Sequence, residues 1–422
     1  MPSLWAATAP SITATPALSE SLSVDVAIVG AGYTGLSTAL HLAERGASVC
    51  VLEAREPGWG ASGRNGGQVN PTLKHDPDEL VRLYGAAHAE PLIETVSGSA
   101  DLVFNLIERH RIDCAPVRKG WMQVSYCEKG VAGLHARADQ WARRGVPVQR
   151  LDARAVAARM GSEAFAGGWI DGRAGAIQPL AYARGLVSAA QAAGVRVHGR
   201  SPVTGLQRQG SGWQLQTAGG PQVTADQVVL ATNGYSGDLW PGMAQSVLAA
   251  NSFIVATKPL SGHAAQSILP GQETVSTSQR LLLYFRKDAY GRLLMGGRGL
   301  FDDPTGPADF AHLERSLALL FPQLGALEFE YRWAGRIAIT RDFMPHVHEP
   351  APGLTLALGC NGRGIALCTS LGQQLAGRLC DRHSPFAYPV TALQRLPMHG
   401  LQRIYIGAGV AWYSLLDRLN VN

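Results

Sequence analysis

The stretch that most constrains the fold is residues 24–53, VDVAIVGAGYTGLSTALHLAERGASVCVLE. Its β-branched residues predict a strand from Val24 to Val29. Gly30, Gly32 and Gly35 follow at G-x-G-x-x-G spacing, between this strand and an apolar-periodic segment. The order of strand, glycine turn and helix predicts a parallel βαβ unit that binds a dinucleotide.

The helix predicted after the glycine turn carries Leu36, Leu40 and Ala43 on one apolar face. Its N-terminus would point unpaired N–H groups and a positive dipole end at the turn, which favours a diphosphate. The next predicted strand, residues 48–52, leads into Glu53, whose carboxylate is placed to accept hydrogen bonds from ribose hydroxyls. A glycine-rich turn without a nucleotide is the alternative interpretation.

A second glycine cluster follows at residues 58–68, GWGASGRNGGQ. Small residues let the backbone approach a flat ligand closely, Ser62 and Asn65 supply hydrogen bonds, and Arg64 can offset phosphate charge. A tight surface loop is the alternative, which the position of the cluster soon after Glu53 disfavours.

Length and composition bound the remaining possibilities. The 422 residues, 46% of them apolar, predict two or three domains with an ample core. The net charge of +5 is mild and its lysines and arginines are dispersed, so we expect no nucleic-acid partner. The cysteines form no CxxC pair or zinc-like spacing, which predicts no disulfide framework, no metal site and a reducing, cytoplasmic location. The N-terminal 21 residues lack a signal-peptide pattern and are predicted to be a tail.

Further α/β signals recur along the chain. Strands are predicted at 194–206, 213–217, 227–230 and 354–358, and a helix at 365–380. Between them, residues 78–149 have a mainly helical pattern, and residues 252–300 alternate as in an antiparallel sheet, with a hairpin turn near 289–291.

These segments predict an α/β fold with a Rossmann-like cofactor domain built from discontinuous segments. An α+β substrate domain based on an antiparallel sheet is inserted between them. We assign residues 1–80, 150–235 and 330–422 to the cofactor domain, and residues 81–149 and 236–329 to the substrate domain.

Five motifs together resemble a known family. They are VAIVGAGYTGLSTALHLAERGASVCVLEA, GWGASGRNGGQ, VVLATNGY, WAGRIAITRDFMPHV and GCNGRGIAL. They are similar to the D-amino-acid-oxidase-type FAD-dependent oxidoreductases, and within these to the gamma-glutamylputrescine oxidase branch, from about Trp5 to the end of the chain. The resemblance implies FAD, a two-domain fold and oxidation of a C–N bond in an amine or amino acid.

The resemblance also implies which residues hold the cofactor. By position they are Gly30, Gly32 and Gly35 at the pyrophosphate, Glu53 at the ribose, Ser62, Arg64, Asn65, Gly66 and Gly67 along the diphosphate and ribityl chain, Val203 and Thr232 at the adenine half, and Gly362, Arg363, Gly364 and Ile365 at the flavin pyrimidine. The helix beginning near Gly364 would stabilise negative charge on the flavin. Related sarcosine oxidases attach flavin through a cysteine that the WAGRIAI segment lacks, so FAD is expected to be noncovalent.

The catalytic candidates implied by the resemblance are Gln68, Tyr284, Arg286, Trp333 and Arg336. Tyr284 would align an amine or stack on it, and Arg286 or Arg336 would hold a substrate carboxylate in bidentate fashion. Structural roles in a strand or the core are the alternatives, above all for Trp333. His346 and His348 are interpreted as surface or packing residues.

The expected function is FAD-dependent oxidation of a small amine, such as a polyamine derivative, to an imine that hydrolyses to an aldehyde, with O2 reduced to H2O2. One alternative is a D-amino-acid or glycine type dehydrogenase that passes electrons to a quinone or another acceptor. This choice stays open because the segment from Arg292 to Arg298 offers Met295 and no oxygen-activating lysine. A further alternative is a flavin-binding protein without catalysis. An amphipathic helix predicted at 401–416 would dock on the protein or make peripheral membrane contact.

Overall fold

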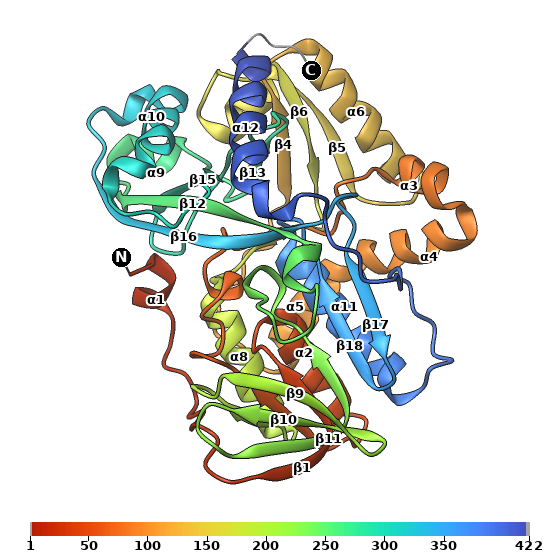
Figure 1. Ribbon diagram of the computed structural model, residues 1–422. Coiled ribbons are helices and arrows are strands. Elements are labelled where there is room, and N and C mark those ends of the chain that lie inside the picture. The colour runs from red at the N-terminus through yellow and green to blue at the C-terminus, as the bar shows by residue number, and fades with distance from the viewer. Residues whose placement is uncertain (1, 419–422) are drawn as a thin grey trace.

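The computed structural model describes residues 2–418, which form two eight-stranded sheets (Figure 1). The first sheet, at the bottom of Figure 1, has the order β17 (His346–Ala351), β18 (Leu354–Leu358), β11 (Gln222–Leu230), β1 (Leu22–Val29), β2 (Val49–Leu52) and β8 (Arg196–His198), with β10 (Gly212–Thr217) and β9 (Val203–Gln209) branching from β11. The second, at the top, has the order β16 (Phe329–Ile339), β12 (Leu248–Pro259), β15 (Arg292–Arg298), β14 (Tyr284–Lys287), β13 (Thr274–Thr277), β4 (Trp121–Ser125), β6 (Gly167–Asp171) and β5 (Val148–Asp152). A two-stranded sheet pairs β3 (Gln68–Val69) with β7 (Gly175–Ala176).

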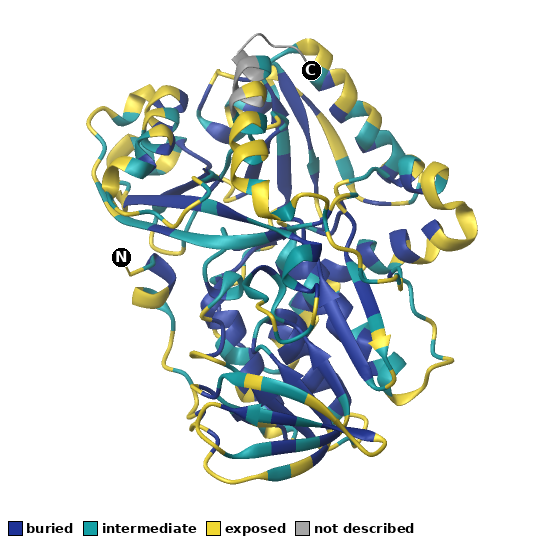
Figure 2. Cartoon of the chain, in the orientation of Figure 1, coloured by how far each residue is buried: buried dark blue, intermediate teal, exposed yellow. Residues whose placement is uncertain are grey.

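Helices cover both sheets. The α-helices are α1 (Leu4–Thr8), α2 (Tyr33–Ala43), α3 (Pro77–Tyr84), α4 (Ala86–Ser97), α5 (Ser99–Arg109), α6 (Glu128–Ala142), α7 (Ala153–Met160), α8 (Pro179–Ala192), α9 (Gly262–Ser267), α10 (Ala311–Leu320), α11 (Gly364–Cys380) and α12 (Gln402–Arg418). Short 3₁₀ turns lie at η1 (Ala61–Gly63), η2 (Asn233–Tyr235), η3 (Ala244–Ser246), η4 (Pro307–Phe310), η5 (Pro322–Leu324) and η6 (His399–Leu401). Figure 2 shows buried residues concentrated in the strands, while α6 and α10 turn exposed residues outward.

The first sheet is parallel through β18, β11, β1, β2 and β8. Alternate residues of β1 enter different cores, because successive side chains of a strand point to opposite faces. Val26 and Ile28 pack with α2, α5 and α8, whereas Ala27 and Val29 pack with residues of β10 and β18. This arrangement confirms the predicted Rossmann-like domain, and it brings the carboxyl ends of β1, β2, β11 and β18 to one edge.

The second sheet is antiparallel except where β13 pairs with β4. The predicted hairpin is present as β14 and β15, and Gly291 in its turn has a φ of +79°. A core that includes residues of α7 and α10 fills one side of this sheet. The predicted substrate domain is therefore built on the predicted kind of sheet.

The division between the sheets differs from the predicted segments at two places. Strand β6, the last three residues of β5 and all but the first residue of β16 belong to the second sheet, although they fall in segments 150–235 and 330–422 that we assigned to the cofactor domain. The reason is long-range pairing: β16 runs along β12 from Phe329 to Ile339, and β5 pairs with β6. If the domains are assigned by sheet membership, the second cofactor segment begins after β6 and the third begins after β16.

The N-terminus is not the predicted tail. Residues 4–8 form α1, which Ser3 caps by accepting a hydrogen bond from the Ala6 N–H at 3.0 Å. Leu4 and Trp5 are buried. The segment therefore joins the core, and Trp5 reaches the site described below.

The predicted C-terminal helix is present as α12. Arg403 forms an ion pair with Asp302, and its guanidinium carbon lies 5.9 Å from the ring centre of Phe301. Ile404 and Trp412 are exposed. Within residues 2–418, none of the helices combines the length and the apolarity that crossing a membrane requires.

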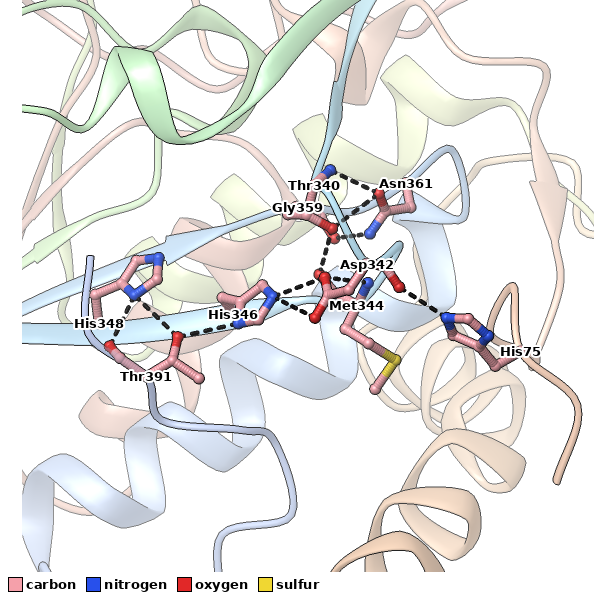
Figure 3. A network of polar contacts seen from close by, with 9 residues as sticks. All are labelled: His75, Thr340, Asp342, Met344, His346, His348, Gly359, Asn361 and Thr391. Carbon is pink, nitrogen blue, oxygen red and sulfur yellow. Dashed lines mark hydrogen bonds and ion pairs between the residues drawn. The ribbon is translucent and has the colours of Figure 1, made fainter. Parts of the chain in front are cut away.

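Polar contacts hold the segment that connects β16 to β17 in place (Figure 3). His75 Nε2 donates to the Asp342 carbonyl at 2.7 Å, and His346 Nε2 donates to the Asp342 carboxylate at 2.9 Å. His346 Nδ1 lies 3.0 Å from Thr391 Oγ1, and His348 Nδ1 donates to the Thr391 carbonyl at 2.9 Å. The two histidines thus have packing roles, in agreement with their interpretation from the sequence.

Asp342→Asn is expected to lower the free energy of unfolding by about 1 kcal/mol, a value that allows for the partial exposure of this ion pair. Burial acts to raise the pKa of Asp342, but the hydrogen bond and charge of His346 and the Met344 N–H outweigh it and hold the pKa at about 2. The folded pKa lies below the unfolded one, so the contribution is complete above about pH 4 and is lost as pH falls toward 2. Urea unfolding between pH 7 and 2 measures it, with the exposed Glu163→Gln as control. An unchanged pH dependence in the Asn variant would contradict this role.

Candidate cofactor and substrate site

The first glycine turn is too crowded for side chains. Gly30 has a φ of +106°, and a Cβ there would lie 3.0 Å from the Ala231 carbonyl oxygen. A Cβ at Gly32 would lie 2.9 Å from Ser62 Oγ, and one at Gly35 only 2.0 Å from the Gly30 carbonyl oxygen. Gly32 is the N-cap of α2 and has no side chain to cap the helix. Apart from the Tyr33 N–H, which Ser62 Oγ accepts, the turn presents the N-terminus of a helix without a side-chain cap, which suits an anionic ligand.

Glu53 lies beside this turn at the end of β2. Its Oε2 accepts the Ala31 N–H and its Oε1 accepts the Arg55 N–H, both at 2.9 Å. Burial raises the pKa of Glu53, and these N–H groups partly oppose that effect. Each carboxylate oxygen keeps a lone pair for a further donor, such as a ribose hydroxyl.

The second glycine cluster folds back onto the first. Ser62 Oγ accepts the Tyr33 N–H at 3.0 Å, at the start of α2. Asn65 Nδ2 donates to the Ser62 carbonyl at 2.9 Å, and Asn65 Oδ1 accepts the Gly67 N–H at 2.8 Å. Arg64 donates through Nε to the Trp59 carbonyl at 2.7 Å. The side chains of the predicted cofactor loop thus hold its backbone in shape.

Three side chains donate hydrogen bonds to successive backbone carbonyls of this loop. Trp333 Nε1 donates to the Arg64 carbonyl at 2.9 Å, Trp5 Nε1 to the Asn65 carbonyl at 2.8 Å, and Arg286 Nε to the Gly66 carbonyl at 2.8 Å. The three donors come from β16, α1 and β14, so both the second sheet and the N-terminal helix fix the loop.

Trp5 determines the direction of one peptide group. In a trans peptide the C=O and the following N–H point in opposite directions. Because Trp5 holds the Asn65 carbonyl, the Gly66 N–H points away from Trp5, and it donates to no acceptor among residues 2–418. This N–H is a free donor in the middle of the predicted cofactor loop. Sequence reasoning missed Trp5, because α1 is only five residues long and carries no periodic pattern.

The predicted catalytic residues Arg286 and Trp333 both pack against Trp5. Arg286 is 5% exposed, its Nη2 donates to the Ile177 carbonyl at 2.6 Å, and its guanidinium carbon lies 5.1 Å from the Trp5 ring centre. Burial lowers the pKa of Arg286 to about 10. Trp333 meets Trp5 edge-on at 5.8 Å. Both side chains position the loop, and two of the guanidinium nitrogens of Arg286 are committed to backbone carbonyls.

Tyr284 packs beside Gly66. Its ring fills the space beside Gly66, where a Cβ would come within 2.5 Å of it, and its hydroxyl lies 2.9 Å from Ser252 Oγ. Burial raises the pKa of Tyr284 to about 12, so the phenol is protonated at neutral pH. Gln68 Nε2 donates to the Val275 carbonyl at 3.1 Å and ties β3 to β13.

The remaining catalytic candidate, Arg336, lies apart from these residues. Its Nη2 forms an ion pair with Asp303 Oδ2 at 3.0 Å, and the two side chains are 43% and 66% exposed. Its backbone N–H donates to the Tyr235 hydroxyl at 3.1 Å. A substrate carboxylate would have to compete with Asp303 for this guanidinium.

The other predicted cofactor residues also lie near strand ends of the first sheet. Val203 begins β9 and pairs with Thr217, and Thr232 follows β11 with its methyl 3.5 Å from a Cβ built at Gly30. After β18, Asn361 accepts the Thr340 N–H at 3.0 Å and donates to the Gly359 carbonyl at 2.7 Å (Figure 3). These bonds shape the turn of Gly362, Arg363, Gly364 and Ile365, in which Gly362 has a φ of +81° and Gly364 begins α11.

Residues 25–378 match the model of the DAO family, described as FAD dependent oxidoreductase. The chain belongs to this family. It is 35% identical over 429 aligned residues to gamma-glutamylputrescine oxidoreductase of Escherichia coli (strain K12), covering 99% of both chains. Its fold resembles glycine oxidase from Geobacillus kaustophilus, with a TM-score of 0.74, 25% identity and coverage of 89% of this chain and 99% of the other. L-proline dehydrogenase from P. horikoshii gives a TM-score of 0.73 at 18% identity, covering 93% and 99%.

These comparisons confirm the resemblance to the DAO-type family and its gamma-glutamylputrescine oxidase branch, and they make this chain an FAD-dependent oxidoreductase. The residues fit FAD: the glycine turn puts no side chain between a ligand and the start of α2, Glu53 has lone pairs to spare beside it, and Gly66 offers a free N–H. The assignment of individual cofactor contacts stays a prediction, tested by the two variants below.

Glu53→Gln is expected to weaken FAD binding about tenfold, because an amide NH2 at the Oε2 position would face the Ala31 N–H and leave a donor unpaired. The measurement is the dissociation constant of FAD from refolded apoprotein, followed by flavin fluorescence. The control is Glu56→Gln, which removes an ion pair with Arg200 and a charge near Glu53 but no hydrogen bond of Glu53. Equal FAD affinity of the two variants would contradict the role of Glu53.

Trp5→Phe is expected to keep the aromatic packing but release the Asn65 carbonyl, and so to weaken FAD binding about tenfold. The same titration measures it, with far-ultraviolet circular dichroism to check the fold. Trp213→Phe is the matched control. Trp213 lies in β10 of the first sheet, and its Nε1 also donates to a backbone carbonyl, that of Pro352, at 3.1 Å. If both variants bound FAD equally, Trp5 would have no special part in orienting the loop.

Proposed function

We propose that this chain oxidises the C–N bond of a small amine, a polyamine derivative or an amino-acid-like amine, to an imine that hydrolyses to an aldehyde, with O2 reduced to H2O2. The observation that carries the proposal is the contact of Tyr284, from the second sheet, with Gly66 of the cofactor loop. A substrate bound on that sheet would thus lie next to the cofactor. The names of the relatives, which include a gamma-glutamylputrescine oxidoreductase and a glycine oxidase, support this class of substrate.

The chain would contribute orientation and electrostatics, while bound FAD supplies the two-electron acceptor. Tyr284 would orient the amine through its hydroxyl, which Ser252 holds at 2.9 Å. Because its pKa is raised to about 12, this phenol acts as a hydrogen-bonding group and not as a base at neutral pH. The N-terminus of α11 would favour negative charge next to the turn that begins at Gly362.

A dehydrogenase that passes electrons to a quinone or another acceptor is the second candidate. The β14–β15 hairpin supplies one lysine, Lys287, and its Nζ donates to the Ala265 carbonyl at 3.0 Å. Met295 in β15 is buried. The hairpin thus offers no lysine whose amine is free to promote the reaction with O2. This favours an electron acceptor other than O2. Membership of an oxidoreductase family disfavours the alternative without catalysis.

We also infer a reducing, cytoplasmic location, because the six cysteines are all free thiols. For α12, which exposes Ile404 and Trp412 but is held through Arg403, we favour docking on the protein over peripheral membrane contact. Cell fractionation tests the location, and sedimentation with anionic vesicles tests the membrane contact.

Anaerobic mixing with a panel of amines tests the proposal. At least one amine is expected to bleach the visible flavin absorbance, and readmitted air is expected to yield one H2O2 for each amine oxidised. Bleaching without peroxide, with rapid turnover on a quinone, would assign the dehydrogenase. If dithionite bleached the flavin but every amine failed to, amine oxidation would be wrong.

Tyr284→Phe is expected to lower kcat/KM for the best amine about tenfold, since it removes one orienting hydrogen bond. FAD content should not change, because the ring beside Gly66 is retained. Tyr290→Phe is the control, since Tyr290 lies in the same hairpin and is 63% exposed. Equal kinetics of the two variants would remove Tyr284 from the substrate site.

A further inference from the structure

Two cysteine thiols meet at the start of α11. Cys360 lies just after β18, four residues before the helix begins at Gly364, and Cys368 lies one turn into the helix. A Cβ built at Gly364 would lie 3.9 Å from the sulfur of Cys360 and 3.9 Å from the sulfur of Cys368, so the two sulfurs approach one point. Cys360 is 7% exposed, and solvent reaches more of Cys368. The chain thus brings together two thiols from either side of a turn.

Both thiols line the same small cavity. Its other polar side chains are Thr34, in the first turn of α2, and Asn233, in η2. Thr34 follows the glycine turn that suits a diphosphate, and Cys360 precedes the turn that is predicted to face the flavin pyrimidine. The cavity therefore lies between the two turns that are predicted to hold FAD.

Cys360 is the more acidic of the two thiols. Hydrogen bonding by the Cys368 thiol is the largest cause that lowers the pKa of Cys360, and the Gly362 N–H adds to it, against burial, which acts to raise the pKa. The hydrogen bond to Cys360 and burial raise the pKa of Cys368. The N-terminus of α11 also favours a thiolate at Cys360, because the positive end of the helix dipole lies there. Cys360 is thus the nucleophile, and Cys368 is its protonated partner.

Three other cysteines have surroundings that disfavour the thiolate. Burial raises the pKa of Cys50 and the pKa of Cys114 to about 12, so both thiols stay protonated at neutral pH. Cys380 is exposed, but it is the last residue of α11, where the helix dipole disfavours negative charge. These three thiols are therefore expected to react with an oxidant more slowly than Cys360.

We propose that Cys360 and Cys368 form a modification site, at which hydrogen peroxide converts the two thiols to a reversible disulfide that weakens FAD binding. The inference rests on the proposed function only for the source of the peroxide, which turnover with O2 would release beside the cofactor. A cytoplasmic location supplies the reductant, since its thiol pool returns such a disulfide to the dithiol.

The reaction has two steps. The Cys360 thiolate attacks one oxygen of H2O2, the O–O bond breaks, and hydroxide leaves Cys360 as a sulfenic acid. The Cys368 sulfur then attacks the Cys360 sulfur, the S–O bond breaks, and the hydroxyl leaves as water with the proton of the Cys368 thiol. The hydroxide of the first step takes up the proton that Cys360 lost on ionisation. Two thiols are thus oxidised to one disulfide, and one H2O2 is reduced to two molecules of water.

The disulfide would change the turn that is predicted to face the flavin. In the reduced protein the Gly362 N–H stabilises the Cys360 thiolate, and the Cys360 carbonyl accepts the Arg363 N–H at 3.0 Å. The disulfide removes the charge that Gly362 stabilises, and it ties the end of β18 to α11. Gly362, with a φ of +81°, lets the backbone of the turn move in response. If the disulfide weakens FAD binding, bound FAD must disfavour the disulfide by the same factor.

Peptide mapping tests the site without turnover. The reduced protein, with and without FAD, is treated with a small molar excess of H2O2, and the remaining thiols are blocked with N-ethylmaleimide before digestion. Trypsin cleaves after Arg363, between the two cysteines, so the disulfide links the peptides 342–363 and 364–378. This linked pair is expected to form, to disappear with dithiothreitol, and to leave Cys380 alkylated. Absence of the linked pair in both forms, at a dose that oxidises Cys380, would overturn the proposal.

Variants assign the two roles. In Cys368→Ser the sulfenic acid of Cys360 has no second thiol to react with, so it is expected to persist and to be labelled by dimedone. In Cys360→Ser the Cys368 thiol is expected to stay unlabelled at the same dose. Cys380→Ser is the matched control and should form the disulfide as the wild type does. Equal labelling of the remaining thiol in the first two variants would contradict these roles. If a variant failed to fold by circular dichroism, the mapping of the wild type decides.

The affinity for FAD tests the coupling to the cofactor. The oxidised protein is expected to bind FAD about tenfold more weakly than the reduced protein, and dithiothreitol to restore the affinity. In a dithiothreitol redox buffer, bound FAD is expected to shift the equilibrium about tenfold, or about 30 mV, toward the dithiol. Cys360→Ser is the control, because peroxide should leave its FAD affinity unchanged. Equal FAD affinity of the reduced and oxidised wild type would overturn the coupling.

Added peroxide separates failure of this inference from failure of the proposed function. If amine turnover released peroxide, but neither this nor added peroxide linked Cys360 to Cys368, the modification site would be wrong and amine oxidation would stand. If added peroxide formed the disulfide, but no amine bleached the flavin, the modification site would stand and the proposed function would be wrong.

Discussion

The hydrogen bond from Trp5 to the Asn65 carbonyl is the contact on which the geometry of the site depends most. It turns the Asn65–Gly66 peptide so that its N–H faces away from α1 and is free for a ligand. Trp333 and Arg286 secure the carbonyls on either side. Because these donors lie on elements distant in the sequence, the shape of the loop depends on contacts from both the second sheet and the N-terminal helix.

The charged groups around this loop divide into those that the protein has already paired and those that it has not. Arg64, Arg286 and Arg336 each have a carbonyl or a carboxylate as partner. Glu53 accepts two backbone N–H groups and has lone pairs to spare. Glu53 thus marks where a ribose would bind, at the end of β2.

The sequence was most informative where local rules decide the structure. Gly30, Gly32 and Gly35 could be interpreted because only glycine tolerates such close backbone contacts, and β1, α2, β2 and the β14–β15 hairpin follow from hydrophobic periodicity and turn residues. Their positions at strand ends are also the reason why Glu53 and the turn before α11 are predicted to lie near the cofactor.

What the sequence could not supply are the pairings between distant segments. The membership of β5, β6 and β16 in the second sheet follows from strand pairing that no local pattern encodes. Likewise, the short helix α1 seemed a tail because the burial of Trp5 depends on β14 and β16. Arg286 and Trp333 lie beside the cofactor loop and donate to its backbone carbonyls, and their assignment as catalytic residues stays a prediction.

Hydrogen exchange of the cofactor loop tests the central claim most directly. In refolded apoprotein, peptides that cover residues 60–68 and 30–36 are expected to exchange faster than in the FAD-loaded protein, because the Gly66 N–H and the first N–H groups of α2 gain acceptors when FAD binds. Peptides from the distant helix α10 should exchange equally in both forms. Equal exchange of residues 60–68 in the two forms would contradict the claim that Trp5 presents this loop to the cofactor.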